Sequence, residues 1–525
     1  MNGRFSVWVT EAGAKRSASA ILTMALAVLA VAFAGLACCP EAEAGDAVTV
    51  ATWGELKDAC ADGGIGSIKL SGDIVDDSGD DAIPIGKTVD INLDGHKIDR
   101  QRGADGKPLG GIFVITGGYL MIHGGTLAGG HAAKGGCIQV QDGKLEAANV
   151  VFQDSFADDV GGAVSSEGGA TISITGSSFA NNASKNDGGA LHCVSQGLTD
   201  FDSVKFTGNK SLGGKGGALF ITENEFSLIN CEFSGNSAAT GGAFAFESTM
   251  QYLGLLVQSN KFTENSAAGD GGAMHIKTPM FFLEGIECTG NTAGGDGGAL
   301  SFVDTTIIFQ DQYEPKGDNV FKDNKADHSG GAISLKGYGY MQGQLEGAAY
   351  EGNRAGEHGG AIYVDAGSQV YVVDSKFTGN SAGADGGAIL IGDGSSLFGL
   401  MGTVVVKDGT AGGKGPNICI RGNQVIECRD LADGCDIGIE LDNQGRAFTT
   451  AFDENNPGKD PARIFKSDSK DYYVASDPET KEAKTFKSGS GGDMSGDNTL
   501  LIVGGVIAVL AIIGIAVYAV KIRKP

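Results

Sequence analysis

Residues 377–389 read FTGNSAGADGGAI and contain two sequence marks that recur along the chain. The first mark is a Gly-Gly-Ala triplet followed by an apolar residue, and consecutive copies lie 25 to 33 residues apart. Nine copies at a nearly constant spacing indicate a repeat architecture. The copies begin at Gly161, Gly188, Gly216, Gly241, Gly271, Gly297, Gly330, Gly359 and Gly386.

The second mark is an aromatic residue with an asparagine three positions later, usually nine residues before the first glycine. Weaker copies extend the array: Ser155 stands in the asparagine place after Phe152, Cys288 replaces the aromatic residue before Asn291, and Gly135 and Gly415 begin degenerate glycine corners. The full pairs are Phe179/Asn182, Phe206/Asn209, Phe233/Asn236, Phe262/Asn265, Phe321/Asn324, Tyr350/Asn353 and Phe377/Asn380.

Each repeat predicts two short strands and no helix. Apolar residues three and five positions after the first glycine face inward, and the residue between them faces outward. A second alternating pair lies seven and five positions before the aromatic residue. Because one repeat cannot bury its apolar face but stacked repeats can, the sequence predicts an all-β, single-stranded right-handed parallel β-helix of the pectin-lyase-like class.

In such a helix the marks have physical roles. We expect the Gly-Gly pair at a sharp corner, because glycine tolerates positive φ and close backbone approach. The aromatic column should stack inside the tube, and the asparagine column should form an amide ladder from coil to coil. Residues 52–61 read as a short helix that caps the first open edge of the sheet.

The predicted domain organisation follows from where the marks begin and stop. Residues 45–125 are expected to form the N-terminal cap and first coils, 126–420 the repeat helix, 421–465 a C-terminal cap and 466–498 a flexible stalk. The long repeat step over residues 304–319 predicts an acidic loop that stands off the rod.

The two ends predict export and anchoring. Residues 1–44 resemble a signal peptide cleaved after Ala44, with lipidation at Cys38 or Cys39 as the alternative. Residues 499–520 are long and apolar enough to span a lipid bilayer, which leaves 521–525 as a basic cytoplasmic tail. The end is similar to a Gram-positive sorting signal, but residues 492–496 depart from the Leu-Pro-x-Thr-Gly pattern. We therefore expect a retained anchor in a single-membrane, Gram-positive type envelope.

Composition narrows the class of partner. The 525 residues include 87 glycines without a strict three-residue period, which excludes collagen. The formal net charge is −25, and such a surface repels nucleic acid and anionic lipid. We therefore predict no nucleic-acid partner.

The repeat marks resemble those of the polymorphic outer membrane proteins of chlamydiae over about residues 150–420. Each short motif is weakly specific, whereas nine in register are strongly specific. The resemblance implies a surface-displayed β-helix with a role in adhesion. The C-terminal membrane domain of that family has no counterpart here, since this chain ends in a single apolar segment.

The search for chemistry gives only weak candidates. Acids precede the Gly-Gly pair at four corners, where turn formation is favoured over a Ca²⁺ site. His192 and His275 share a column without being neighbours and are expected to face outward. Asp327-His328 and Glu357-His358 lie on adjacent coils and are the constellation to test for acid–base chemistry or Zn²⁺. The four corner acids are Asp187, Asp270, Asp296 and Asp385.

Eight cysteines follow the signal peptide. In an exported protein Cys428 is expected to pair with Cys435 or with Cys419. Four others lie at inward or corner positions of the coils, where cysteine serves as a small apolar core residue. These four are Cys137, Cys193, Cys231 and Cys288.

The function predicted from these observations is a non-catalytic cell-surface adhesin or binding scaffold, with no catalytic residue, metal or cofactor. Its partner would be an unidentified host, cell or glycan ligand. Two alternatives stay open: a carbohydrate-active β-helix enzyme, and a structural component of the cell envelope.

Overall fold

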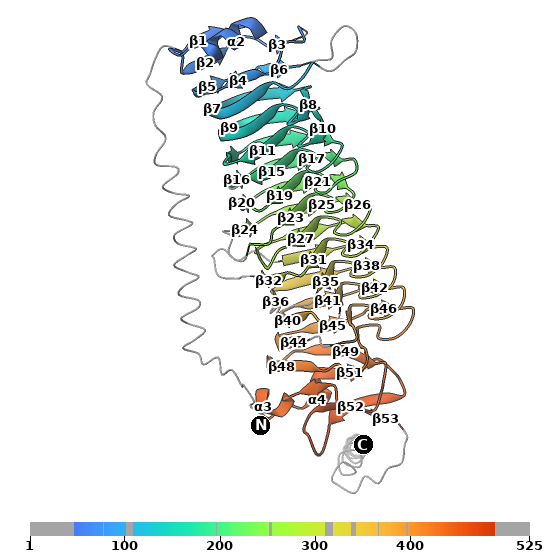
Figure 1. Cartoon of the computed structure of the whole chain (residues 1–525). Helices are drawn as coiled ribbons and strands as arrows, with labels where there is room; N and C mark the ends of the chain where they lie inside the picture. The colour runs from blue at the N-terminus through green and yellow to red at the C-terminus, as the bar shows by residue number, and fades with distance from the viewer. Residues whose placement is uncertain are drawn as a thin grey trace, which may run out of the picture.

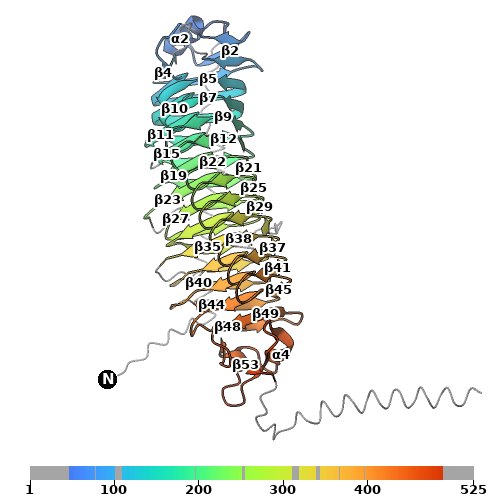
Figure 2. The ribbon, with the colours of Figure 1, turned by 90° about the vertical axis from the view of Figure 1, so that its right-hand side faces the viewer.

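The computed structural model describes residues 47–488 except 77, 101–108, 196, 251–254, 310–318, 338–342, 366 and 395–396. These residues form a long rod, a parallel β-solenoid of about 14 turns with few helices (Figures 1 and 2). Each turn adds its strands to those of the turn before, in parallel and in register. The predictions of an all-β chain and of stacked repeats are therefore confirmed.

Three columns of strands form the walls of the rod. The strands after the glycine corners, the last of which is Gly415-Pro416, are β11 (Val164–Gly168), β15 (Leu191–Ser195), β19 (Leu219–Thr222), β23 (Phe244–Glu247), β27 (Met274–Lys277), β31 (Leu300–Val303), β35 (Ile333–Lys336), β39 (Ile362–Val364), β43 (Ile389–Ile391) and β47 (Ile418–Ile420). The next column comprises β12 (Thr171–Thr175), β16 (Leu198–Asp202), β20 (Glu225–Ile229), β24 (Leu255–Gln258), β28 (Met280–Leu283), β32 (Thr306–Phe309), β36 (Gly343–Glu346), β40 (Gln369–Val373), β44 (Leu397–Gly402), β48 (Ile426–Leu431) and β50 (Thr449–Thr450).

The third column carries the aromatic residues. It comprises β13 (Ser178–Ala180), β17 (Lys205–Thr207), β21 (Glu232–Ser234), β25 (Lys261–Thr263), β29 (Glu287–Thr289), β33 (Asn319–Lys322), β37 (Ala348–Glu351), β41 (Lys376–Thr378), β45 (Val405–Lys407) and β49 (Asp436–Leu441). In the first complete repeat one long strand, β9 (Ile138–Gln153), supplies all three positions, because it pairs with β11, β12 and β13. A separate 11-stranded sheet of mostly two-residue strands, from β8 (His131–Lys134) and β10 (Phe156–Val160) to β46 (Thr410–Ala411), follows the asparagines.

The two glycines of each corner are required for different reasons. The first glycine has a φ between +62° and +72° in all nine copies, a region that other residues rarely adopt. The second glycine lies against the next coil: a Cβ on Gly217 would meet the carbonyl oxygen of Gly242 at 2.1 Å. The prediction of a sharp corner with close backbone approach is confirmed, and the two demands fall on separate residues.

The aromatic column is a continuous stack inside the tube. Phe152, Phe179, Phe206, Phe233 and Phe262 have nearly parallel rings with centroids 4.6 to 5.0 Å apart. Cys288 interrupts the column, which resumes as Phe321, Tyr350 and Phe377. These centroid separations lie within the range of favourable aromatic pairs, and the register of the coils repeats the contact along the column.

The asparagine column is a buried ladder in which the amides bond from coil to coil. Asn265 Oδ1 accepts from the backbone N–H of Asn236 at 3.0 Å and from its Nδ2 at 2.9 Å. Asn265 Nδ2 donates to the carbonyl of Phe233 and to Asn291 Oδ1, both at 3.0 Å. The ladder begins at Ser155, whose N–H donates to Asn182 Oδ1. The predicted amide ladder is confirmed.

The ladder continues across the longest step of the repeat. Asn291 Nδ2 donates to Asn324 Oδ1 at 3.0 Å although 33 residues separate them, and Asn324 Nδ2 donates to Asn353 Oδ1 at the same distance. On the other side, Asn209 Nδ2 donates to Asn236 Oδ1 at 3.0 Å. The asparagines are at most 1% exposed, so these marks belong to the interior of the rod and cannot contact a ligand at its surface. They are Asn182, Asn209, Asn236, Asn265, Asn291, Asn324, Asn353 and Asn380.

The N-terminal end of the rod is covered by helix α2 (Trp53–Ala61), as predicted. Thr52 caps the helix by accepting a hydrogen bond from the N–H of Glu55, and Leu56 and Cys60 are buried. Below the helix, Arg100 forms a buried ion pair with Asp76 at 2.9 Å and lies 4.6 Å from the centre of the Trp53 ring. The first coils contain β1 (Val48–Val50), β2 (Ser67–Leu70), β3 (Ile74–Val75), β4 (Ile83–Ile85), β5 (Thr88–Asn92), β6 (Lys97–Asp99) and β7 (Phe113–Ala128).

The C-terminal end differs from the expectation of a cap that stops at residue 465. Residues 466–487, assigned to a stalk, continue the ordered structure: β51 (Phe465–Ser467) pairs with β49, and β52 (Tyr472–Ser476) forms an antiparallel hairpin with β53 (Ala483–Lys487). The hairpin packs against the end of the rod because Val474 and Ala483 are part of the buried core. Two short helices, α3 (Phe452–Asn455) and α4 (Pro461–Ile464), complete this end.

The predicted disulfides are absent from the described part of the chain, where all eight cysteines are free and buried. Cys428 and Cys435 both belong to the buried core, and Cys435 Sγ donates to the Gly402 carbonyl at 3.3 Å. The prediction of small apolar core residues holds for Cys137, Cys193, Cys231 and Cys288, which are all 0% exposed.

Several predictions lie outside the described residues. These are the signal peptide 1–44 with its cleavage at Ala44, residues 489–498 of the stalk, the span 499–520, the tail 521–525 and most of the acidic insertion. Of the insertion, residues 306–309 belong to strand β32 and Asn319 begins β33, which narrows the interruption to residues 310–318.

The ladder generates a first prediction. Replacing Asn265 with alanine leaves the backbone N–H and amide of Asn236 and the carbonyl of Phe233 without their partner. Each buried group left unpaired costs about 1–3 kcal/mol, so the unfolding free energy should fall by at least about 3 kcal/mol. Chemical denaturation measures the loss. The control is Asn186→Ala, which removes an exposed amide bonded to Asp159 and should change little; equal effects of both substitutions would contradict the ladder's role.

The aromatic stack generates a second prediction. The hydroxyl of Tyr350 is buried without a hydrogen-bond partner in the described residues, and burial raises its pKa. Tyr350→Phe should therefore raise the unfolding free energy by about 1 kcal/mol, measured as a shift in the denaturation midpoint. Tyr371→Phe is the matched control, because the Tyr371 hydroxyl donates to Glu427 at 2.5 Å and its loss should destabilise. A lower midpoint for Tyr350→Phe would be the contrary result.

Candidate functional site

The outward residues of the strands that follow the Gly-Gly corners form one long face, here called the GGA face. Strand alternation places these side chains outside the tube, opposite the core residues on either side of them. They are nevertheless covered: all but His192 and Tyr363 are 9% exposed or less. The GGA face comprises Ser165, His192, Phe220, Ala245, His275, Ser301, Ser334, Tyr363, Leu390 and Cys419.

Ion pairs cross the strands of the GGA face. In each pair one partner immediately precedes a Gly-Gly corner and the other stands at the far end of a strand, so the pair bridges the width of the GGA face. We call these pairs straps. They are Lys134–Glu167 at 3.0 Å, Lys215–Glu247 at 2.6 Å, Lys336 with Asp270 at 3.4 Å and with Asp296, and Arg421–Asp385 at 2.8 Å.

The four corner acids do more than form turns. One carboxylate oxygen of each accepts the backbone N–H of the residue at the next corner, at 2.7 to 2.8 Å. This contact fixes one coil to the next. In Asp270, Asp296 and Asp385 the other oxygen holds a strap. The predicted structural role is thus a bond between coils, and it leaves one oxygen of each carboxylate facing the GGA face.

The two histidines of the GGA face are kept neutral. The ring of His192 stacks on Phe220 with centroids 5.4 Å apart, and burial lowers its pKa to about 4. Burial also lowers the pKa of His275, against the opposing effect of Glu247 and Asp270. Both residues lie on the outward side as expected, but neither is freely exposed, because straps and neighbouring coils enclose them.

The two Asp/Glu-His pairs singled out from the sequence do not assemble into one site. They are out of register by one residue, since the N–H of Glu357 donates to the carbonyl of His328. His328 is exposed, whereas the His358 ring lies 3.2 Å from Arg421 and beside the Tyr363 ring. Within the described ranges, no group of three or more His, Cys, Asp or Glu side chains is arranged to hold a metal ion.

Two features were missed from the sequence. A second set of coil-to-coil bonds uses residues two positions before the aromatic column: the N–H of Cys231 donates to Asn260 Oδ1, and that of Ile286 to Asn319 Oδ1. The other missed feature is the set of straps. A signal for both existed, because Asn260 and Asn319 precede Phe262 and Phe321 by the same step, and Lys336 and Arg421 each follow a corner glycine by six residues.

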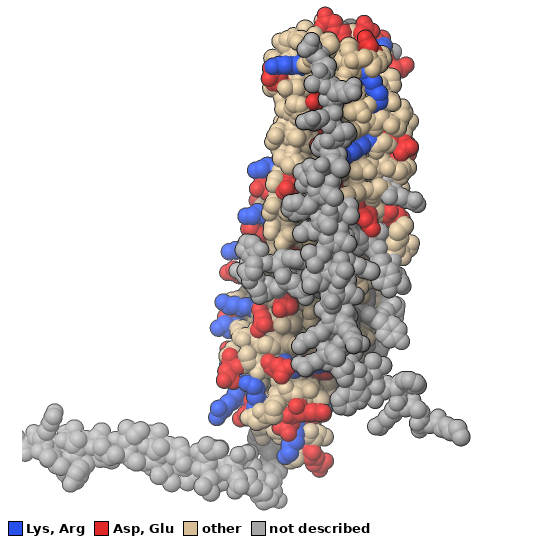
Figure 3. All heavy atoms as spheres, turned by 90° about the vertical axis from the view of Figure 1, so that its left-hand side faces the viewer, with Lys and Arg blue, Asp and Glu red and all other residues tan. Residues whose placement is uncertain are grey.

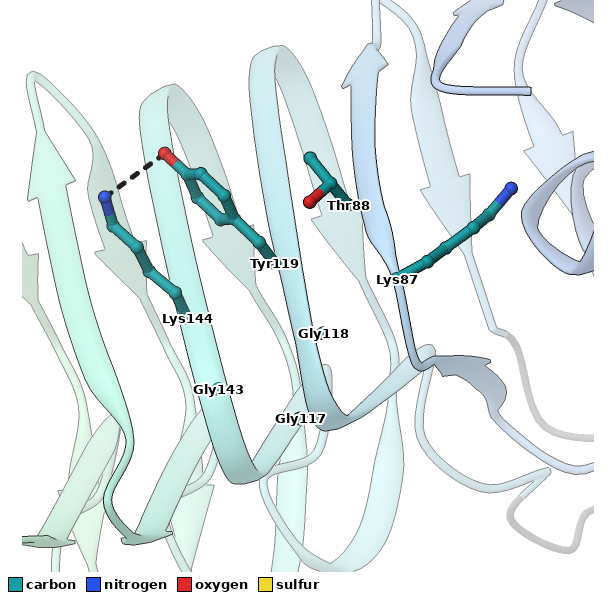
Figure 4. A pocket seen from close by; sticks show the side chains of 7 residues that line it. All are labelled: Lys87, Thr88, Gly117, Gly118, Tyr119, Gly143 and Lys144. Carbon is teal, nitrogen blue, oxygen red and sulfur yellow. Dashed lines mark hydrogen bonds between the residues drawn. The ribbon is translucent and has the colours of Figure 1, made fainter. Parts of the chain in front are cut away.

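The surface of the first coils carries a weaker candidate for a binding site. An open hollow of about 320 Å³ lies over the first coils, lined by Lys87, Tyr119, Lys144 and glycines (Figure 4). Lys144 Nζ is bonded to the Tyr119 hydroxyl at 3.2 Å, and Lys87 points away toward the carbonyls of Asp62 and Ile65. Both ammonium groups are thus engaged by the protein itself.

On the solvent side of the aromatic strands, opposite charges follow one another. Lys205 pairs with Glu232 at 3.1 Å, and Lys261 pairs with Glu287 at 3.0 Å on the next two coils. Basic and acidic side chains lie next to each other along one edge of the rod in Figure 3. Exposed pairs of this kind contribute little to stability, so their main effect is to avoid stacking like charges.

Comparison with known proteins gives one match. Residues 374–392 match the family model of the Chlamydia polymorphic membrane protein repeat. The match includes Phe377, Asn380 and the corner at Gly386, so it covers one copy of both sequence marks. No curated protein and no solved structure matches the chain.

The buried histidine generates a third prediction. The pKa of His192 is about 4 in the folded state and about 6.5 when unfolded, so the unfolded chain binds the extra proton between these values. Its contribution to stability is complete above pH 6.5 and is lost as the pH falls toward 4. His192→Phe should flatten this part of the stability profile, measured by urea denaturation.

The control for that experiment is Phe220→Leu, which alters the same stack without removing a titratable group. Its profile should be displaced but should keep the wild-type slope. An unchanged slope in His192→Phe would contradict the account of this residue.

Proposed function

We propose that this chain is a cell-surface β-helix protein that acts as a non-catalytic adhesin or binding scaffold for a host, cell or glycan ligand. The observation that carries the proposal is the division of labour along the repeat. The glycines, aromatic residues and asparagines are all engaged in stacking the coils. The residues that vary from coil to coil lie on the outer sides of the strands, where a rod of this form can present the solvent-exposed ones to a partner.

The match to a polymorphic membrane protein repeat supports a place at the cell surface. We take the solenoid to be right-handed and of the pectin-lyase-like class, in agreement with the repeat pattern. In the described part of the chain, no helix is long and apolar enough to cross a membrane. The proposed signal peptide 1–44, anchor 499–520 and single-membrane envelope rest on the terminal sequences alone.

The contacts of the acids argue against an enzyme as the first choice. A carbohydrate-active site needs carboxyl groups free to donate or accept a proton, or to attack the sugar. Asp270, Asp296 and Asp385 each have one oxygen bound to a backbone N–H and the other to a basic side chain. Both oxygens of each carboxylate are thus already occupied by donors, an arrangement that suits recognition better than proton transfer.

The fourth prediction tests this function. Cells that display the full chain should adhere to a surface of host cells or immobilised glycans, and a chain lacking residues 135–420 should not. The comparison uses equal surface levels, measured with an antibody to the N-terminal cap. Unchanged adhesion without the repeat coils contradicts a binding rod, and release of soluble products from polysaccharides would favour the enzyme instead.

A further inference from the structure

Three buried polar atoms without partners lie in a row on the GGA face. They are Nδ1 of His275 and the hydroxyl oxygens of Ser301 and Ser334, and no described residue bonds to any of them. The three residues are in register on consecutive strands, β27, β31 and β35. They are 9%, 0% and 0% exposed. Elsewhere in this rod the asparagines of the ladder are bonded from coil to coil, so a row of unsatisfied groups requires an explanation.

The row lies beneath a single basic side chain. Lys336 starts at the end of β35, and its ammonium reaches Asp296 and Asp270 at the opposite edge of the GGA face. Its side chain therefore crosses the strands that carry Ser301 and Ser334. Asp270 and Lys336 are also among the charges that act on His275, which places the imidazole at the same site.

Part of this cover is open to solvent. The side chains of Lys336 and Asp270 are 31% and 30% exposed, whereas Asp296, the second partner of Lys336, is 14% exposed. Partly exposed pairs of this kind are only weakly stabilising. A ligand that met the carboxylates and the three unsatisfied atoms together would gain more hydrogen bonds than the strap supplies.

We infer that this part of the GGA face is a binding site for an extended neutral oligosaccharide, which replaces the Lys336 strap and lies along β27, β31 and β35. This inference rests on the proposed function, since it names the ligand class of the binding rod.

The chemistry of the site selects this class. Carboxylate oxygens accept only, an ammonium donates only, and serine does both, so the ligand needs groups that donate and accept at short intervals. Sugar hydroxyls meet that demand. Tyr363, only partly buried on the next strand with the His358 ring beside it, offers an apolar surface to a sugar ring. Polyanions are disfavoured by Asp270, Asp296 and the net charge of −25.

The strand spacing supports a chain rather than a single sugar. Consecutive parallel strands are about 4.8 Å apart, so the row presents one polar group per coil along the axis of the rod. A linear ligand can meet all three groups only if it runs along that axis. A single sugar reaches fewer of them and should bind more weakly.

The test uses the full-length protein and arrays of linear neutral oligosaccharides: glucans, mannans, galactans and N-acetylglucosamine oligomers. The wild-type chain should bind at least one of them. Ser301→Ala combined with Ser334→Ala should lower that affinity about tenfold or more, because two hydrogen bonds to the ligand are lost. The same double variant should be at least as stable as the wild type, since it removes two unsatisfied hydroxyls. A merely structural role would give the reverse pattern.

The matched control is Ser165→Ala, which changes the same column on β11, beyond the Lys215–Glu247 strap. It should leave affinity unchanged. Unaltered oligosaccharide binding by the double serine variant overturns the inference. Binding of only anionic glycans or of proteins also overturns it. So does a structure in which ordered water alone bonds to the three atoms. If adhesion requires residues 135–420 but not these serines, the proposed function stands and this site is wrong. If adhesion does not require residues 135–420, the proposed function itself is wrong.

Discussion

The structure depends on the fixed spacing of hydrogen-bonded parallel coils. Because each turn pairs in register with the next, every side chain lies directly over its counterpart about 4.8 Å away. A residue type can therefore recur at the same place in coil after coil only if it can stack on itself. Amides satisfy this condition through the ladder, phenyl rings through parallel stacking, and glycine through the absence of a Cβ. The sequence marks recur because every coil is stacked on the next at the same spacing.

The same constraint shapes the outer faces. Like charges on neighbouring coils repel, and two faces of the rod reduce this repulsion in different ways. Along the aromatic strands the chain alternates lysine and glutamate, as in Lys205, Glu232, Lys261 and Glu287. Across the GGA face it places a base at one edge and an acid at the other, which makes the straps. The straps then enclose a row of polar groups that the stacking itself does not need.

Sequence reasoning reached the solenoid because its marks recur with one period and one chemistry each. It did not predict contacts between residues whose types are not repeated from coil to coil. The ion pair of Lys336 with Asp296 joins a residue at the end of one strand to a corner on another coil, and it bridges the face that carries His275 and Ser301. The ordered structure beyond residue 465 was not predicted, because the segment is mostly polar. Its hairpin is held to the core by only a few apolar residues, among them Val474 and Ala483. Cysteine pairing was predicted from proximity in sequence, whereas Cys428 and Cys435 are free thiols of the buried core and Cys435 Sγ hydrogen-bonds to the Gly402 carbonyl.

The claim that coil-to-coil stacking carries the fold is tested most directly by a double-mutant cycle within the ladder. The unfolding free energy is measured for the full chain with Asn236→Ala, Asn291→Ala and both together, and again with Asn236→Ala and Asn265→Ala. Asn236 and Asn265 bond directly, whereas Asn236 and Asn291 are separated by one coil. The account predicts a coupling of about 1 kcal/mol or more for the adjacent pair and a smaller one for the separated pair. Additive effects for Asn236 and Asn265 would contradict it.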